Sequence, residues 1–382
     1  MSERTVAIIG LGLRIATVWR HLQTASCGGL RLVGYADPDP VGLEPLQAAG
    51  TDPGRSFIDH QAMLDQLRPD VVLIGSPNHL HLGHIRDALA AGCRVFSEKP
   101  VVISVEETMA CARLLRQHGA DRLLVGLVLR SSPLFRAMRA VADRLGQVVS
   151  IEANEHLSPE HGGFLMRDWR RRREWAGSFL LEKCCHDIDL LHCHAGSRLV
   201  RLASFGGRGI YLPQHADLEQ PRLGNGQRRY RSWRRGWQGA DTVFTSDADV
   251  VDHQVVIGAF ENGVKLTFHT NTHAPLGERR QVLFGTHATL EGQFGSGRLR
   301  LRTVDGPVEE QDTGDEQGGH GGADVAMGRD LAATLVDGAP FPVPAKAALE
   351  VGLAAMAADR AMREECVITI ADEYAMLDRI LP

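Results

Sequence analysis

Short apolar runs alternate with helix-like segments along the first third of the chain. The extended runs lie at 5–9, 30–36, 70–75, 94–97 and 123–128. Between them, apolar residues recur at helical spacing at 15–22, 61–67, 84–91 and 105–118. Strands and helices in regular alternation predict a parallel sheet flanked by helices.

The pattern changes after residue 147. Longer strand-like stretches follow at 148–154, 200–205, 250–260, 264–270, 279–284 and 288–292. They predict a larger, mainly antiparallel sheet. Residues 324–365 have a helical pattern that three prolines interrupt. The chain is therefore expected to be α/β at its N-terminal end and α+β beyond.

Composition narrows the class of protein. A chain of 382 residues favours two domains. A formal net charge of −5 gives no general attraction to nucleic acid or to anionic membranes. The sequence has no apolar stretch of membrane-spanning length, and its first residues do not resemble a signal peptide. An odd number of cysteines, seven, is typical of reduced thiols, so we expect a cytoplasmic protein.

A glycine pair follows the first strand. Gly10 permits a tight turn, and Gly12 lets a phosphate approach the backbone beside Leu13 and Arg14, just before the predicted helix. Ile15 stands where a third glycine is usual. The alternative is that two glycines simply end a buried strand, but the position favours a dinucleotide-binding turn.

Asp37 ends the second apolar run, where a carboxylate can accept hydrogen bonds from the adenosine ribose. Its charge would repel a 2′-phosphate, which favours NAD over NADP. Arg14 lies nearby in the sequence and could bind such a phosphate, so NADP remains possible.

Several ordered motifs resemble one enzyme family. They are Ser76-Pro77-Asn78-His79-Leu80-His81, Ser97-Glu98-Lys99-Pro100, the segment from Leu181 to Asp189, Gly285-Thr286 with Leu290-Glu291-Gly292, and His320-Gly321-Gly322 with Asp324. Together they resemble the glucose-fructose oxidoreductase/inositol dehydrogenase/MocA (Gfo/Idh/MocA) family over essentially the whole chain. Two departures are Ile15 in the glycine turn and Glu182 in place of an aspartate.

The resemblance implies a domain organisation. We expect a dinucleotide-binding Rossmann domain at 1–126, with a doubly wound parallel sheet. A substrate-binding and oligomerisation domain would follow at 127–382, with a large, mostly antiparallel open sheet that packs into homodimers or homotetramers. The expected cofactor-binding residues are Gly10, Gly12, Leu13, Arg14, Asp37, Ser76, Pro77, Asn78, His81, Glu98 and Lys99.

Oxidation of an alcohol needs a base for the hydroxyl proton, and Lys99 is our candidate, as the resemblance also implies. The alternative is a surface lysine that closes a strand. His186 lies four residues after Glu182 and three before Asp189, so the three share one helical face and could point at one hydroxylated carbon. A histidine within a packing stripe is the alternative.

Further candidates are less specific. Lys183 could place a second ammonium near the substrate or pair at the surface. Trp169 and Arg170 begin an arginine run, 170–173, that could bind an anionic group on the substrate, although such runs usually form a solvated face. Cysteines and histidines between 184 and 194 suggest zinc, but adjacent cysteines diverge on a helix and no second ligand pair follows, so we expect core thiols and no metal.

These residues predict an enzyme that moves a hydride between NAD(P) and a secondary hydroxyl of a sugar, inositol or related cyclitol. One alternative retains NAD and carries out redox-assisted epimerisation or glycoside elimination. Another is a ligand-sensing regulator without catalysis. A polar, arginine-rich stretch at 214–239 is expected to be a loop outside the main sheet, near the mouth of the active site or at a subunit contact.

Overall fold

The computed structural model describes residues 3–219, 224, 230, 239–314 and 320–382. They form two compact units. The first comprises Met1–Pro133, Glu316–Gly352 and Tyr374–Pro382, and the second comprises Leu134–Asp315 and Leu353–Glu373. The domain boundary at 126/127 stays a prediction, but the return of two C-terminal segments to the first unit was not foreseen from the sequence.

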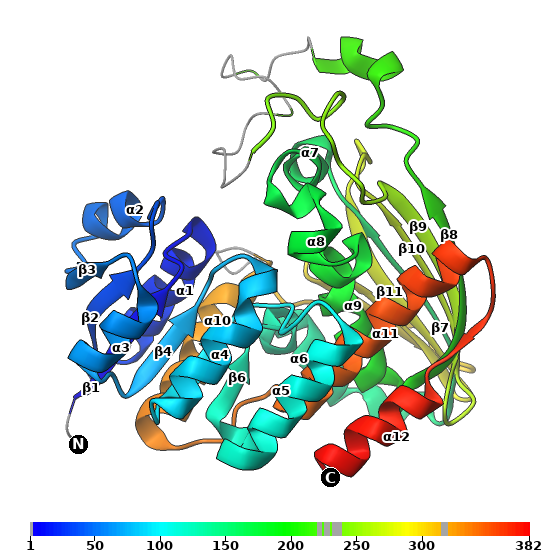
Figure 1. The fold of residues 1–382 in the computed structure, drawn as a ribbon. Helices are drawn as coiled ribbons and strands as arrows, with labels where there is room; N and C mark the ends of the chain where they lie inside the picture. Colours follow the sequence, from blue (N-terminus) through cyan, green and yellow to red (C-terminus); the bar gives the residue numbers. More distant parts are fainter. Residues whose placement is uncertain (1–2, 220–223, 225–229, 231–238, 315–319) are drawn as a thin grey trace. The chain divides into compact units, whose positions relative to one another are not determined.

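The first unit is built on a six-stranded parallel sheet with strand order β3-β2-β1-β4-β5-β6 (Figure 1). Its strands are β1 (Arg4–Ile9), β2 (Leu30–Ala36), β3 (Arg55–Phe57), β4 (Val71–Ile74), β5 (Arg94–Ser97) and β6 (Leu123–Val125). Its helices include α1 (Leu13–Ala25), α2 (Leu43–Ala48), α3 (His60–Leu67), α4 (His81–Ala90) and α5 (Val105–His118). The predicted parallel sheet is confirmed; β3 and α2 are too short to have given a periodic signal.

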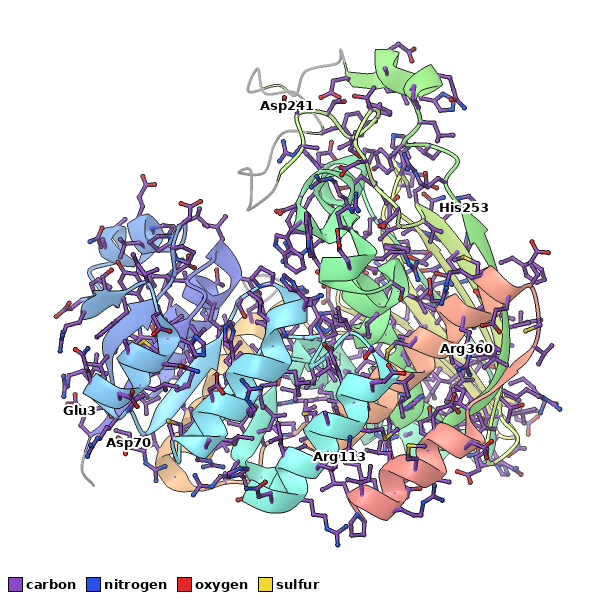
Figure 2. All side chains as sticks on the ribbon, in the orientation of Figure 1. Glu3, Asp70, Arg113, Asp241, His253 and Arg360 are labelled. Atoms are coloured by element: carbon purple, nitrogen blue, oxygen red, sulfur yellow. The ribbon has the colours of Figure 1, made fainter. Side chains whose placement is uncertain are left out.

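The strands of this sheet end along one edge. Asp70, labelled in Figure 2, accepts hydrogen bonds from the Thr5 backbone N–H (2.7 Å) and hydroxyl (2.9 Å), which ties the start of β4 to β1. Since carboxyl ends of parallel strands share an edge, the residues after β1, β2, β4 and β5 gather there.

The C-terminal segment of the first unit packs on α1 through α10 (Ala323–Ala332). A Cβ on Gly328 would lie 2.7 Å from the Cβ of His21, so glycine permits the close approach. The Ser131 hydroxyl also donates to the carboxylate of Asp330 at 2.5 Å. A single-turn π-helix (Ala333–Asp337) follows, and α11 (Ala345–Glu364) and α12 (Ala371–Ile380) complete the chain.

The second unit contains a nine-stranded sheet with order β14-β13-β12-β11-β7-β10-β9-β8-β15. Its strands are β7 (Val148–His156), β8 (Leu199–Gly207), β9 (His253–Phe260), β10 (Lys265–Asn271), β11 (Glu278–Gly285), β12 (Ala288–Gln293), β13 (Arg298–Thr303), β14 (Val308–Asp312) and β15 (Ile368–Thr369). Only the β7–β10 pairing is parallel among the described strands of this sheet. The mainly antiparallel sheet is thus confirmed, with β13 to β15 added.

The two faces of this sheet differ. One is covered by helices that include α9 (Phe179–Ala195), and the Gln254 side chain donates to the backbone oxygen of Ala358 at 3.4 Å. On the other face Phe205, Val255 and Ile257 are 68%, 38% and 50% exposed. His253, labelled in Figure 2, begins β9. Shorter helices of this unit are α6 (Pro133–Ala140), α7 (Pro159–Arg167) and α8 (Arg173–Ala176).

The stretch 214–239 is described only in part. A 3₁₀-helical segment covers Pro213–Glu219, and none of the described positions in the stretch belongs to a strand. Tyr230 is buried, and its hydroxyl lies 2.7 Å from His273 Nε2. Residues 220–223, 225–229 and 231–238 lie outside the described part of the chain, so the position of the loop stays a prediction. Among the described helices, none has both the length and the apolar composition needed to cross a bilayer.

Candidate active site

The glycine turn of the first unit fits a dinucleotide pyrophosphate. Gly10 has a φ of 79°, and a Cβ there would lie 2.4 Å from the Ser76 backbone nitrogen, so only glycine is tolerated. Gly12 is the N-cap of α1 and, among the described residues, no side chain caps that helix. The first amide groups, from Leu13 onward, are therefore available to a phosphate.

Ile15 does not disturb this turn, because the space it needs is provided by the facing strand. Ile15 is fully buried, and a Cβ on Gly75 would lie 2.5 Å from the Ile15 Cβ. The third glycine of the usual motif allows a helix to approach a strand closely. Here the strand end carries the glycine and the helix carries the side chain.

Asp37 follows β2 beside the glycine turn. Its carboxylate accepts the Asp39 backbone N–H at 2.7 Å. Partial burial raises the pKa of Asp37, although backbone hydrogen bonds from Asp39 and Leu11 oppose the rise. Gly42 N–H donates to the Leu11 oxygen at 2.9 Å, so the loop after β2 packs on the turn. Asp37 thus lies directly after β2, and its contact with the adenosine ribose stays a prediction.

His81 connects the ends of β4 and β5. Its Nδ1 lies 2.8 Å from the Pro100 oxygen, and its Nε2 lies 2.9 Å from the Ser76 oxygen. Asn78, after Pro77, is also buried. The Ser76 hydroxyl lies 2.9 Å from His84 Nδ1, and burial together with neighbouring histidines lowers the pKa of His84 to about 3. His81 therefore has a structural role at the predicted cofactor edge.

The Glu-Lys-Pro element stands at the end of β5. Glu98 is buried and Lys99 is partly exposed. Glu98 Oε2 accepts the Lys99 backbone N–H at 3.3 Å, while Glu98 Oε1 accepts from Arg14 Nε at 2.9 Å. Arg14 also donates from Nη1 to Asp324 at 2.5 Å. The guanidinium therefore already has two carboxylate partners.

Helix α9 carries the substrate-side candidates of the second unit. Ser178 caps it by accepting the Leu181 N–H at 3.1 Å. Glu182, His186 and Asp189 are all buried on this helix, at 5%, 3% and 0% exposed. The expected spacing on one helix is present, and the contact of these three side chains with a substrate stays a prediction.

Glu182 is held by Arg170, whose Nε lies 2.6 Å from its carboxylate. The Arg170 guanidinium stacks 4.2 Å from the Trp169 ring and 4.5 Å from the Phe164 ring. Three of the predicted residues therefore meet in one cluster, and Glu182 has a cationic partner there. Glutamate is longer than the aspartate usual at this position of the motif, and its side chain reaches Arg170 from α9.

Lys183 lies in the interior, not at the surface. Its Nζ is 3.1 Å from His161 Nε2 and 3.4 Å from Glu155. Arg279 from β11 contacts Glu155 at 2.5 Å and Asp187 at 3.0 Å. Sequence reasoning missed His161, Glu155, Arg279 and Asp187. Charged residues inside an otherwise apolar strand and helix were the available signal.

Asp187 is fully buried beside this cluster. Burial raises its pKa to about 7, and the positive charge of Arg279 works against the rise. Buried ionic groups of this kind persist only where opposite charges and hydrogen bonds compensate the loss of water.

The arginine run after Trp169 is neither a solvated face nor an open anion site. Arg171 and Arg172 contact Asp247 at 2.5 and 2.8 Å, and Arg173 pairs with Asp359. With Arg170 on Glu182, each arginine of the run has a carboxylate partner within the protein. Binding of an anionic substrate group by the run is therefore disfavoured.

Two of the three cysteines of α9, Cys184 and Cys185, are buried thiols, and Cys193 is partly exposed. Cys184 is buried with its Sγ 3.5 Å from the Thr270 hydroxyl, and burial raises its thiol pKa well above the ordinary value. Among the described residues, no three histidine, cysteine or acidic side chains are grouped as metal ligands.

Lys99 belongs to the first unit, and Glu182, His186 and Asp189 belong to the second. Within the first unit the structure brings the glycine turn, Asp37, His81 and Glu98 to one edge. Within the second it groups Glu182 with Arg170 and Trp169. Joint action of Lys99 and His186 stays a prediction.

Two family models match this chain. Residues 4–127 match an oxidoreductase family with an NAD-binding Rossmann fold, and residues 135–291 match the GFO/IDH/MocA C-terminal domain. The first unit is therefore an NAD-binding Rossmann domain.

Curated relatives match over part of their length. D-glucoside 3-dehydrogenase of Escherichia coli (strain K12) is 35% identical over 120 residues, which cover 31% of this chain and 33% of the relative. Inositol 2-dehydrogenase of Rhizobium meliloti (strain 1021) is 28% identical over 178 residues, covering 46% and 50%. The chain thus spans half or less of these relatives.

A solved structure shares the fold along nearly the whole chain. Levoglucosan dehydrogenase in complex with NADH and levoglucosan has a TM-score of 0.77 at 17% identity, covering 97% of this chain and 100% of that one. An oxidoreductase domain protein from Kribbella flavida has a TM-score of 0.79 at the same identity. With the motif residues, the two-unit architecture and both family models in agreement, this chain belongs to the GFO/IDH/MocA family of NAD-binding oxidoreductases.

Proposed function

We propose that this protein is an NAD-dependent dehydrogenase that oxidises a secondary hydroxyl of a sugar, an inositol or a related cyclitol. The observation that carries the proposal is Lys99 at the carboxyl end of β5 in the NAD-binding unit, with its backbone N–H held by Glu98. The relatives named above act on a glucoside and on inositol, which supports a polyol substrate.

The cofactor fits the residues present, because Gly10 lets the turn pack directly on the backbone of Gly75 and Ser76, and α1 has no capping side chain among the described residues. Bound NAD supplies the hydride acceptor for alcohol oxidation. Gly10, Gly12 and Leu13 would hold the pyrophosphate, and Asp37 the adenosine ribose. Ser76, Pro77, Asn78 and His81 would shape the edge near the nicotinamide.

Lys99 would take the proton of the substrate hydroxyl on its Nζ. His186 would hold the same oxygen, and Asp189 would orient the imidazole from the next turn of α9. Glu182, paired with Arg170, would accept a hydrogen bond from a neighbouring hydroxyl. Lys183 would support this cluster from within through His161 and Glu155.

Asp37 supports NAD over NADP. A carboxylate repels a 2′-phosphate, and Arg14, the nearby cation, is directed to Glu98 and Asp324. The exposed face of the nine-stranded sheet supports a homodimer or homotetramer. Where β8 pairs with β9, Phe205 lies opposite Val255, and the next pair on the same face is Ala203 with Ile257. Contiguous exposed apolar side chains are typical of an interface.

The test is a screen of inositols, aldoses, glycosides and aminocyclitols with NAD or NADP, following NADH formation. Lys99→Met should leave NAD binding intact and lower turnover about 100-fold or more. Lys346→Met, at a surface ion pair of the first unit, is the matched control. His186→Asn should also lower turnover, and the double variant should lose less than the two single losses combined.

Other outcomes separate the alternatives. Conversion of a sugar without net NADH would indicate retained NAD with epimerisation or elimination. NAD binding together with ligand binding, but no turnover of any substrate, would indicate a regulator. Near-native turnover in Lys99→Met would show that the lysine is structural.

A further inference from the structure

Arg14 lies in the first turn of α1, directly after the glycine turn. Its Nε donates to Glu98 Oε1 at 2.9 Å and its Nη1 to Asp324 Oδ1 at 2.5 Å. Both carboxylates are nearly inaccessible, with side chains 8% and 4% exposed. Although burial works against it, these two negative charges raise the pKa of Arg14. The guanidinium is thus a permanent cation between two buried acids.

Glu98 links this arginine to the lysine. One carboxylate oxygen accepts from Arg14, and the other accepts the Lys99 backbone N–H at 3.3 Å. Gly126, after β6, gives the carboxylate its space, since a Cβ there would lie 3.0 Å from Glu98 Oε2. The position of the Lys99 backbone therefore depends on where Arg14 holds Glu98.

The C-terminal segment completes the arrangement. Asp324 at the start of α10 accepts from Arg14 and lies 3.1 Å from His320 Nδ1. Despite burial, the hydrogen bond from His320 and the charge of Arg14 lower the pKa of Asp324. Arg14 is thereby fixed from a second side, by a segment more than 300 residues away.

We propose that Arg14 is a positioning residue, which connects the pyrophosphate-binding turn to Lys99 through Glu98 and does not read the phosphates of the cofactor. The inference rests on the proposed role of Lys99. It also replaces the sequence-based assignment of Arg14 to a 2′-phosphate. A change that orders the first turn of α1 would then also fix the position of the Lys99 backbone.

The first test needs no substrate. Hydrogen–deuterium exchange is measured on the apo protein for the peptide spanning 97–101, which contains the Lys99 amide. Arg14→Met frees Glu98 and should speed exchange of that amide about fivefold to tenfold. Arg14→Lys retains the charge but has a single donor nitrogen, so its effect should be intermediate. Arg20→Met, on an exposed position of the same helix, is the matched control and should change nothing.

The second test uses NAD and a substrate found in the screen. Arg14→Met should lower kcat by up to about 100-fold, with KM for the polyol and Kd for NAD changed less than about threefold. Arg14→Lys should recover part of kcat. Gly126→Ala, which displaces Glu98 without removing a charge, should lower kcat in the same way. Arg14→Met combined with Gly126→Ala should be no worse than the poorer single variant.

The proposal is overturned if exchange at Lys99 is unchanged in Arg14→Met, or if that variant loses NAD or NADP affinity while kcat stays native. Should Arg14→Met fail to fold, Gly126→Ala and Arg14→Lys decide the question by the same readouts. A screen without any NADH-forming substrate would contradict the proposed function, while the exchange measurement would still decide whether Arg14 holds the Lys99 backbone.

Discussion

Replacing Ile15 by glycine would restore the usual three-glycine motif, yet we expect it to destabilise the first unit. Ile15 is fully buried against Gly75 at the end of β4. In this chain the close approach of helix and strand is provided by the strand glycine. A glycine at position 15 would therefore leave a cavity with no residue to fill it.

The expected cost follows from the buried side chain. Truncating a buried isoleucine to alanine costs about 2–5 kcal/mol. A further step to glycine within a helix adds about 1 kcal/mol. A loss of about 3–6 kcal/mol is a large part of the roughly 5–15 kcal/mol that stabilises a typical domain. Ile15→Val, in contrast, should cost only about 0.5–1.5 kcal/mol.

Calorimetry with and without NAD is the assay. The transition that NAD shifts upward belongs to the first unit. Since 1 kcal/mol moves the Tm of a domain of this size by about 2–4 °C, a loss of about 3–6 kcal/mol in Ile15→Gly should lower that transition by roughly 6–24 °C. Gly75→Ala alone should also destabilise, because its Cβ would lie 2.5 Å from the Ile15 Cβ. The double variant, Ile15→Gly with Gly75→Ala, should lose less stability than the sum of the two single losses.

Only partial recovery is expected in the double variant, because the new Cβ would still lie 2.9 Å from the Gly10 oxygen. The reasoning is refuted if Ile15→Gly is as stable as Ile15→Val and also binds NAD more tightly. That result would mean that Ile15 is a tolerated departure and not the partner of Gly75.

Three further predictions concern charge and assembly. Asp37→Ala should reduce the ratio of the NADP to the NAD dissociation constant measured by titration. Lowering the pH should reduce the same ratio in the native protein, because the raised pKa of Asp37 lets protonation remove the repelling charge at a higher pH than for an ordinary aspartate. Asp187 binds its proton more tightly in the folded than in the unfolded protein, so its contribution to stability falls as pH rises from about 4 towards 7. Asp187→Asn should reduce this dependence of the unfolding free energy on pH, measured in denaturant titrations. An unchanged dependence would mean that other groups cause it. Ile257→Asp should shift the mass in sedimentation towards the monomer, whereas an unaltered mass would exclude this sheet face as the interface.

The sequence by itself determined the features that depend on near neighbours in the chain. Periodicity located most strands of both sheets, and α5 agrees at both ends, because Ser104 caps it and Gly119 follows it. The Glu98-Lys99 pair and the helical spacing from Glu182 to Asp189 also follow from short segments. Short elements such as β3 and α2 were missed, since three to six residues carry too little periodicity.

Tertiary structure alone decided which distant charges meet. The sequence made Arg14 a candidate for binding a 2′-phosphate, and in the structure Glu98 and Asp324 contact its guanidinium. Lys183 was equally consistent with the surface, but Glu155 and His161 hold it in the interior. A buried charge requires an opposite charge nearby in space, and nothing in the spacing of residues along the chain identifies that partner. The fold supplies it by bringing together segments that are as many as 310 residues apart.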